Sequence, residues 1–370
     1  MIETLKEEQL KLFNFDFELL GIISNYESFI YQRWAKECGT FELHINREKK
    51  SVDKLNENMW FMLGNNKEKC FLIDTIEETY SEGNTTLVIK GTDLKGLMKR
   101  RITYTDNFDR VDKTQAENVM KHYITNHFID SKLAVEPYTA LAERNMLILE
   151  VATTQNRGIE TVWQSRFENV HDVEKHIAED TGLNWKVYAD FVKKKFVFDV
   201  FEGTDRTLEQ KQVPQILFCK SRQNLKKSRK YKDLSGFKNV AYAGGKGENE
   251  DRPIVVKGTD TGIDRREIFI DLNNISDMDE LNTEAEKKLK DYKKVITIEG
   301  QVFSTTNMKY EEDWFIGDKI TLIIGDIKEN KYISGVKEIY ERNNLNIEVT
   351  FGDKTPSLID EIKKKEGVVE

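Results

Sequence analysis

The stretch EEDWFIGDKITLII, residues 311–324, is the part of this chain that best indicates its fold. Trp314 supplies an apolar anchor before a turn, and Gly317 permits the backbone to bend there. Asp318 stands beside the turn glycine, a position typical of a carboxylate that binds local backbone N–H groups. The strand that follows places three apolar residues on one face: Ile320, Leu322 and Ile324. We therefore predict a structural corner of a β-barrel at Trp314, Gly317 and Asp318, rather than a catalytic loop built on the pair Asp313 and Asp318.

Short apolar runs of the same kind occur along most of the chain and predict a mostly β, α+β fold. Near the N-terminus, Phe13, Phe15, Phe17 and Leu19 alternate with polar residues, which is the period of a half-buried strand. Gly83 and Asn84 permit a tight hairpin, and Asn343-Asn344 is a second candidate turn. The further strands that we expect are 41–45, 60–63, 70–76, 85–90, 295–303, 319–324, 332–340 and 345–351.

Helical patterns interrupt the β pattern in two regions. Thr114 with Glu117 resembles a capping box, followed by one apolar helical face made of Val119, Met120, Tyr123, Ile124 and His127. A second helix carries Val170, Val173 and Ile177 and ends near Gly182, and a third lies at 278–292. We predict a first β-barrel at 1–105, a peripheral α/β domain at 106–200, and a second barrel at 201–355. This second barrel contains an α/β insertion at about 246–295, and a charged tail follows at 356–370.

Composition excludes several classes of protein. The formal net charge of −8 is opposite to that of a dedicated nucleic-acid binder. No apolar run approaches the roughly 18 residues of a membrane span, and the polar first ten residues are unlike a signal peptide. Three widely spaced cysteines, Cys38, Cys70 and Cys219, predict free thiols in a reducing compartment. We therefore expect a chain made in a cytoplasm, without stable membrane insertion.

The sequence contains no clear catalytic, cofactor-binding or metal-binding constellation. The pairs His122/His127 and His171/His176 are spaced i,i+5, which on an α-helix separates the rings by about 140°. We interpret His127 as a packed core histidine. The segment VAYAGGKGE lacks the residues of a phosphate loop, and the many carboxylates neither favour nor exclude a glycosidase pair. We therefore expect no catalytic residues, no cofactor and no metal.

The basic stretch KSRQNLKKSRKYK, residues 220–232, is the strongest local charge anomaly. We interpret it as a charged contact loop, with Lys226, Lys227, Arg229 and Lys230 as its candidate contact residues. A solvated hairpin, an electrostatic contact to an acidic protein neighbour and a phosphate-binding finger all fit this pattern.

Seven fragments, taken in order, resemble the baseplate hub or tail-associated proteins of long-tailed phages and phage tail-like particles. The resemblance covers nearly the whole chain, and Gly91, Leu94 and Leu97 loosely match the run that closes the first barrel in this family. The fragments are YQRWAKECGTFEL (31–43), IKGTDLKGLMKRRI (89–102), VFDVFEGTDRT (197–207), NLKKSRKYKDLSGFKNVAYAGG (224–245), GIDRREIFIDL (262–272), DWFIGDKITL (313–322) and VTFGDKTPSL (349–358).

The resemblance implies two tube-like barrels and two peripheral α/β domains per subunit, and a homotrimer that adapts a sixfold tail tube to a threefold tip. It implies a tail tube or distal tail ring protein, a tape-measure protein, and a spike or fibre protein as partners. DNA would pass without sequence-specific binding. The expected location is the tail tip, after assembly in the bacterial cytoplasm. Alternatives are a receptor- or carbohydrate-binding tail protein and a tail-associated cell-wall hydrolase. The DNA-carrying or killing nature of the particle, its contractility and its host stay open.

Overall fold

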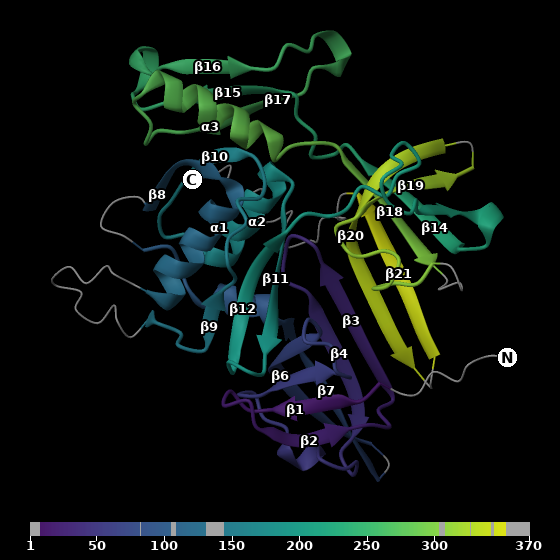
Figure 1. Cartoon of the computed structure of the whole chain (residues 1–370). Coiled ribbons are helices and arrows are strands. Elements are labelled where there is room, and N and C mark those ends of the chain that lie inside the picture. Colours follow the sequence, from purple (N-terminus) through teal and green to yellow (C-terminus); the bar gives the residue numbers. More distant parts are fainter. Residues whose placement is uncertain are drawn as a thin grey trace. The chain divides into compact units, whose positions relative to one another are not determined.

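The computed structural model describes residues 8–81, 83–104, 109–130, 144–302, 308–325, 327–341 and 344–352. The chain divides into two compact units (Figure 1). Unit 1 is drawn from 1–227 and 300–349, and unit 2 from 228–299 and 350–370. The predicted division into four parts stays a prediction, and both the predicted tail 356–370 and Asn343 of the second candidate turn lie outside the described residues.

Unit 1 is built around one long sheet with the strand order β21-β20-β3-β4-β7-β6-β5-β1-β2. β19 pairs with β20, and β13 pairs in parallel with β19. The bounds are β1 Leu10–Phe13, β2 Leu19–Ile23, β3 Ser28–Trp34, β4 Thr40–Asn46, β5 Trp60–Leu63, β6 Cys70–Ser81, β7 Asn84–Asp93, β13 Leu217–Cys219, β19 Lys319–Ile324, β20 Ile327–Glu341 and β21 Asn344–Gly352.

The pairing of β3 with β20 joins strands that lie about 300 residues apart in the sequence. The pairing is antiparallel and runs from Gly335↔Trp34 to Glu341↔Ser28. The first and last β segments of the chain therefore form one continuous sheet (Figure 1). The predicted strands at 41–45, 60–63, 70–76, 85–90, 319–324, 332–340 and 345–351 are confirmed within it. The mostly β fold class is confirmed as well.

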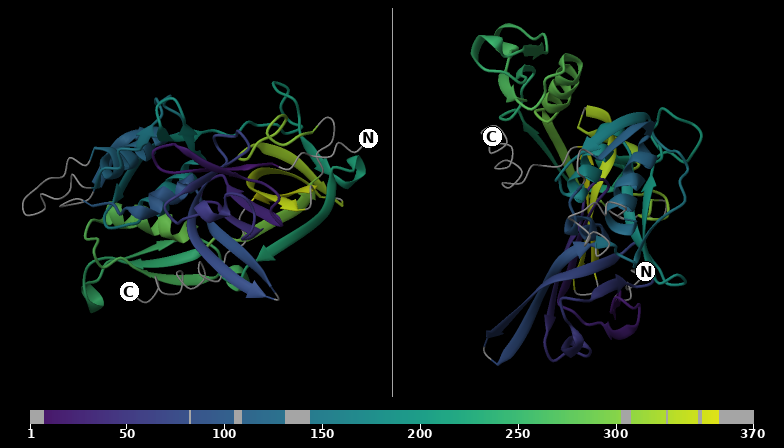
Figure 2. Two further views of the ribbon diagram at one scale, coloured as in Figure 1. Left: turned by 90° about the horizontal axis from the view of Figure 1, so that it is seen from below. Right: turned by 90° about the vertical axis from the view of Figure 1, so that its left-hand side faces the viewer.

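The hairpin of β6 and β7 projects from the rest of unit 1 (Figure 2). Its strands stay paired as far as Ser81↔Asn84, and Gly83 has a φ of 86°, which confirms the predicted tight turn. β5 pairs with β6 only at residues 70–72. Among the described residues, no strand pairs with the other edge of β6 beyond that point, and most side chains of this distal segment are exposed.

The helices of unit 1 pack against two smaller sheets. One has the order β10-β8 and the other β11-β12-β9. Phe13 and Trp60 of the long sheet share a hydrophobic core with these helices and with β11 and β12. The bounds are β8 Asp109–Gln115, β9 Leu149–Val151, β10 Glu160–Ser165, β11 Asn184–Asp190, β12 Lys195–Phe201, the 3₁₀ helices η1 Val52–Lys54, η2 Leu94–Arg100 and η5 Lys220–Arg222, the helices α1 Ala116–Ile124 and α2 Val170–Thr181, and the π-helix η3 Thr125–Ile129.

Unit 2 is a small two-layer α/β structure. Its sheet has the order β16-β15-β17, with β15 antiparallel to β16 and parallel to β17. Leu281 and Ala285 of α3 pack on this sheet, as the apolar face in the sequence predicts. The bounds are β15 Val240–Gly244, β16 Ile254–Lys257, β17 Glu267–Asp271, α3 Met278–Lys290, and the 3₁₀ helices η6 Asn249–Asp251 and η7 Gly262–Asp264; β14 Leu225–Asp233 and β18 Val295–Val302 run across the division between the units.

Two local predictions are wrong. The alternating run 13–19 is not one strand, because β1 ends at Phe13 and Asn14 accepts hydrogen bonds from the backbone N–H groups of Asp16 and Glu18. This side chain closes a turn, and the next strand begins only at residue 19. The proposed capping box also fails, because Thr114 belongs to β8 and Gln115 is the N-cap of α1.

Glu117, the second residue of the proposed capping box, is fully buried and has other partners. Its carboxylate accepts hydrogen bonds from Lys121 Nζ at 2.6 Å and from the backbone N–H groups of Gln155 and Arg157 at 3.1 and 2.8 Å. It therefore ties α1 to the segment that precedes β10. The predicted end of α2 is confirmed, since Gly182 is its left-handed C-cap.

Candidate functional site

The candidate site is the corner that leads into β19, and Trp314 is its apolar anchor. Trp314 is only 1% exposed. Its ring lies 4.7 Å from that of Tyr310 and 5.4 Å from that of Phe218, the latter in an edge-to-face arrangement. Such aromatic pairs contribute about 0.5–1.5 kcal/mol each beyond the burial of their area. The position of the corner relative to β13 and β19 is thus set by packing.

Asp318 holds two separate segments of the chain together. Its carboxylate accepts hydrogen bonds from the backbone N–H groups of Thr204 at 2.8 Å and Phe315 at 2.9 Å, and from Arg206 Nε at 2.8 Å. Asp318 is 3% exposed, so these donors replace almost all of its contact with water. A carboxylate that accepts three hydrogen bonds and is almost closed off from solvent organises backbone and is poorly placed to act on a substrate.

Two glycines allow these segments to approach each other closely. Gly317 has a φ of 91°, a left-handed conformation that favours glycine. A Cβ atom on Gly203 would lie 1.8 Å from the carbonyl oxygen of Gly317, so no larger residue fits there without movement of the backbone. The structure thereby brings together two sequence fragments that we quoted for the resemblance, 197–207 and 313–322.

A buried ionic network lies in the same unit and escaped the sequence analysis. Arg33 of β3 binds Glu68 at 2.7 Å and Glu311 at 3.3 Å. Lys69 binds Glu311 at 3.0 Å and Glu338 of β20 at 2.8 Å. Arg33, Lys69 and Glu338 are each less than 8% exposed. The network therefore links the β3–β20 pair to the segment that carries the corner.

The charges in this network reinforce one another. Burial alone would raise the pKa of Glu68, but Arg33 and Lys186 outweigh this effect and lower the pKa to about 2. Burial alone would likewise lower the pKa of Lys69, but Glu338 and Glu311 raise it above its ordinary value. Among the described residues, Lys69 is the one ion-pair partner of Glu338, so loss of Lys69 would leave a buried carboxylate without a cation, at a cost of about 3–5 kcal/mol.

The turn 34–39, between β3 and β4, is held by side chains from distant segments. Lys95 Nζ donates to three carbonyl oxygens of this turn at 2.6, 3.2 and 3.0 Å, and burial lowers the pKa of Lys95 to about 8. Trp185 Nε1 donates to a fourth carbonyl at 2.7 Å. Asp93 and His171 accept the backbone N–H groups of residues 39 and 38, both at 3.0 Å. The fragments 31–43 and 89–102 therefore meet here as well.

The interpretation of two histidines needs correction. His122 and His127 both bind Asp109, through Nε2 at 2.7 and 2.8 Å. The i,i+5 spacing separates two rings on an α-helix, but here α1 continues into the π-helix η3, whose wider turn brings them to one face. Burial alone would raise the pKa of Asp109, but these two hydrogen bonds hold it well below its usual range. His127 is fully buried in the core, as predicted.

The predicted charged loop is a strand. Lys226, Lys227, Arg229 and Lys230 belong to β14, and the first three are exposed. Arg229 binds Glu299 of β18 at 3.3 Å and stacks over the ring of Tyr231. The sequence of this segment lacks the alternation of apolar and polar residues that is typical of a strand, because most of its residues are basic. For this reason we predicted a loop. Their role as contact residues stays a prediction.

Two further features bear on the chemistry of the chain. In the parts of the chain that the structure describes, no group of three or more His, Cys, Asp or Glu side chains is arranged to hold a metal ion. No helix among these residues is both long and apolar enough to cross a bilayer. Cys38, Cys70 and Cys219 are free and buried, in agreement with the predicted thiols.

The sequence profile of the siphovirus ReqiPepy6 Gp37-like proteins matches residues 9–353. The chain belongs to this family. The match extends from the first strand of the long sheet to the end of β21, so it includes the corner, the ionic network and the 228–299 part of unit 2. No curated protein matches the chain in sequence.

Solved structures show where this Gp37-like fold occurs. A tail protein from Neisseria meningitidis MC58 is 14% identical, with a TM-score of 0.58, over 94% of this chain and 97% of that one. The 43 kDa tail protein of prophage MuSo2 from Shewanella oneidensis is 12% identical, with a TM-score of 0.59, over 94% and 98%. Prophage tail protein gp18 from Listeria monocytogenes EGD-e is 11% identical, with a TM-score of 0.53, over 98% and 99%. The chain has the fold of these phage tail proteins over nearly its whole length.

Proposed function

We propose that this chain is a structural baseplate hub protein at the tip of a phage tail or phage tail-like particle. Three copies form a ring that adapts the sixfold tail tube to a threefold tip. The observation that carries the proposal is the β3–β20 pairing, which joins the β segments from the two ends of the chain in one sheet. Each subunit can then contribute two neighbouring β segments to a ring. Three subunits would contribute six β segments, which matches the sixfold symmetry of a tail tube. The fold shared with whole prophage tail proteins supports the same role.

The distal part of β6 is the edge at which subunits join in this proposal. Among the described strands it pairs only with β7, and Tyr80, near its tip, is 74% exposed. An exposed strand edge offers unpaired N–H and C=O groups to another chain. In a closed ring each such edge pairs with a neighbouring subunit, which satisfies these N–H and C=O groups. No free edge is then left to which further subunits could add to form a filament.

Electron microscopy of the assembled particle tests the hub position. We expect this chain to form a threefold ring with pseudo-sixfold barrels between the tail tube or distal tail ring protein and the spike or fibre. The tape-measure protein is a further partner that we expect at this ring, and DNA would pass without sequence-specific contacts. A particle whose hub position is occupied by a different protein would refute the proposal.

A pair of matched variants tests the proposed edge. Tyr80→Glu places a charge at the exposed tip of the β6–β7 hairpin, and we expect it to block ring formation without unfolding unit 1. Val192→Glu, in the turn between β11 and β12, changes another apolar side chain that is 92% exposed and serves as the control. Equal assembly of both variants and the wild type would place the subunit contact elsewhere.

The basic residues of β14 form a second contact in this proposal. Lys226, Lys227, Arg229 and Lys230 bind an acidic protein neighbour in the particle. Replacing all four with serine should impair assembly and leave the fold intact, because three of them are exposed and exposed charges contribute about 0–1 kcal/mol each to stability. Serine at the exposed Lys49 and Lys50 is the control. Normal assembly of the quadruple variant would mean that these residues are merely solvated.

We also propose that this chain does not cleave peptidoglycan. Cell-wall cleavage at the tail tip would then belong to a separate protein docked below the ring. The purified chain should leave no cleared band in a gel impregnated with host cell wall. A cleared band that disappears on replacement of a single Asp or Glu would overturn the structural role.

A further inference from the structure

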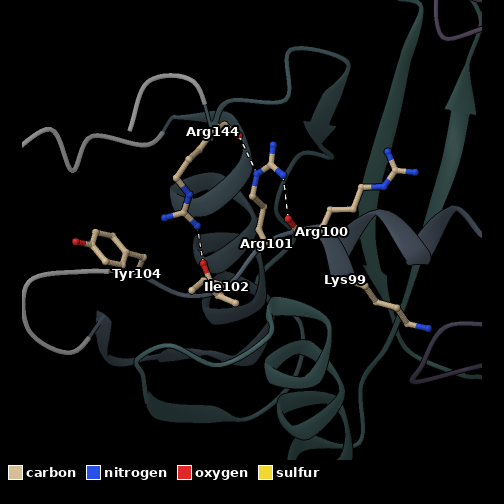
Figure 3. Close-up of a pocket in the computed structure, with 6 residues that line it drawn as sticks. All are labelled: Lys99, Arg100, Arg101, Ile102, Tyr104 and Arg144. Atoms are coloured by element: carbon tan, nitrogen blue, oxygen red, sulfur yellow. Dashed lines mark hydrogen bonds between the residues drawn. The ribbon is translucent and has the colours of Figure 1, made fainter. Parts of the chain in front are cut away.

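A cationic pocket lies in unit 1, at the end of the 3₁₀ helix η2 (Figure 3). Its volume is about 360 Å³, within the range of small-molecule sites. Among the residues that the structure describes, six line it, of which four are cations and none is acidic: Lys99, Arg100, Arg101, Ile102, Tyr104 and Arg144. The chain as a whole carries a net charge of −8, so this local excess of positive charge is opposite to its average.

Two of the arginines are fixed in position by the backbone. Arg101 donates from Nε to the carbonyl of Arg144 at 3.2 Å and from Nη1 to the carbonyl of Arg100 at 2.9 Å. Arg144 donates from Nη2 to the carbonyl of Ile102 at 2.6 Å. Figure 3 shows the Arg101 guanidinium between the Arg144 side chain on one side and the side chains of Arg100 and Lys99 on the other.

Other N–H groups of both arginines make no hydrogen bond to a residue that the structure describes. They are Nη2 of Arg101, and Nε and Nη1 of Arg144. Among the residues that the structure describes, no carboxylate lies within ion-pair distance of either guanidinium. Burial, together with the neighbouring charge of Arg101, lowers the pKa of Arg144. Two like charges held together without a counter-ion are stabilised by a bound anion.

Aromatic and apolar surface adjoins the cations. The Tyr104 ring lies beneath the Arg144 guanidinium at 5.8 Å and 5.7 Å from the ring of Phe167. Phe167 is 54% exposed and has a φ of 59°, a strained conformation for an aromatic residue. The Arg166 guanidinium lies over the Phe167 ring at 4.7 Å, so one face of each ring is covered by an arginine. The remaining aromatic surface can contact a planar base or the C–H face of a sugar, so the site offers contacts to a ring as well as to an anion.

We propose that this pocket binds a phosphate monoester carried on a ring, as in a sugar phosphate or a nucleotide. Arg101 and Arg144 bind the phosphate oxygens in the forked geometry that guanidinium groups favour, and Tyr104 with Phe167 contacts the ring. Lys99 and Arg100 attract the ligand from solvent. The acidic character of the rest of the chain favours a short anion over a long polyanion. This inference goes beyond the hub role and is tested on the isolated protein.

Titration calorimetry on the full chain tests the proposal with inorganic phosphate, glucose 1-phosphate and adenosine monophosphate. We expect both esters to bind more tightly than inorganic phosphate, and the ester that binds better identifies the source of the ligand. Arg101→Gln with Arg144→Gln should weaken ester binding by about tenfold or more. Lys49→Gln with Lys50→Gln removes the same charge from an exposed turn and should leave binding unchanged.

Two further variants keep the test decisive. The double variant Arg101→Lys with Arg144→Lys retains the charge and replaces the glutamine variant if that one fails to fold. We expect it to bind the esters more weakly than the wild type, because a lysine ammonium cannot bind two phosphate oxygens in the planar, forked geometry of a guanidinium. Tyr104→Ser should weaken binding of the esters and leave inorganic phosphate unaffected. The proposal is overturned if neither ester binds at millimolar concentration, if both arginine variants bind like the wild type, or if only a long oligonucleotide binds.

Discussion

Replacing Asp318 with alanine should destabilise unit 1 by about 3–5 kcal/mol, the usual cost of breaking a buried charged pair. The substitution removes the acceptor of three part-buried hydrogen bonds, two of which come from backbone N–H groups. Each hydrogen bond to a charged group contributes about 1.5–3 kcal/mol, and the sum is reduced because the Arg206 side chain, 14% exposed, can turn toward water. Asp318→Asn keeps one acceptor oxygen and should lose about half as much.

Urea unfolding followed by tryptophan fluorescence measures this change selectively. All five tryptophans lie in unit 1, at positions 34, 60, 163, 185 and 314, so the signal does not report on unit 2. Asp313→Ala is the matched control, because Asp313 lies in the same corner but accepts one exposed hydrogen bond, from the N–H of Lys309. It should cost less than about 1 kcal/mol. Equal unfolding midpoints for Asp318→Ala and Asp313→Ala would refute the role that we assign to Asp318.

Three further predictions concern packing, ionisation and thiol reactivity. Gly203→Ala should lower the melting temperature, at a cost of about 3 kcal/mol, because its Cβ would overlap the Gly317 carbonyl; Gly236→Ala meets no atom within 4 Å and should melt like the wild type. Glu174 is fully buried, its carboxyl group has no hydrogen-bond partner among the described residues, and burial raises its pKa. Folding therefore becomes less favourable as pH rises above the pKa of about 4.3 that this group has in the unfolded chain. Glu174→Gln should therefore stabilise the protein more at pH 8 than at pH 5, and the opposite order in urea unfolding would contradict this sign. Burial raises the pKa of Cys38 and Cys70, so a thiol reagent should modify them slowly before urea is added and rapidly afterwards.

Elements with a strong local signal were predictable from the sequence. The apolar face of α1, the glycine that ends α2 and the strand 319–324 depend on nearest neighbours along the chain, and all three are confirmed. The corner at Asp318 was predictable as a turn, because Gly317 permits a left-handed backbone conformation and an Asp beside a turn glycine typically accepts hydrogen bonds from backbone N–H groups. Its partners Thr204 and Arg206 were not, because nothing local connects them to residue 318.

The features that the sequence did not reveal depend on distant partners. β3 was not among the predicted strands, because Arg33 occupies a buried position and its partners Glu68 and Glu311 are far away in the sequence. The π-helix η3 follows α1 without a break, and the apolar pattern of the sequence does not mark the change of helix type. The contact of both His122 and His127 with Asp109 could therefore not be predicted from the helical period. The i,i+5 spacing of two histidines is the feature of the sequence that could have suggested a π-helix here.

The pairing of β3 with β20 also affects how the chain is made. When β3 leaves the ribosome, the strand that will cover one of its edges lies about 300 residues further along. At roughly 5–20 residues per second, that edge waits on the order of 15–60 s for its partner. During this interval the nascent chain presents an open edge and unpaired members of a charged network. Crowded polysomes favour pairing between neighbouring nascent chains, so the yield of correctly folded protein should depend on how densely ribosomes are loaded on the messenger.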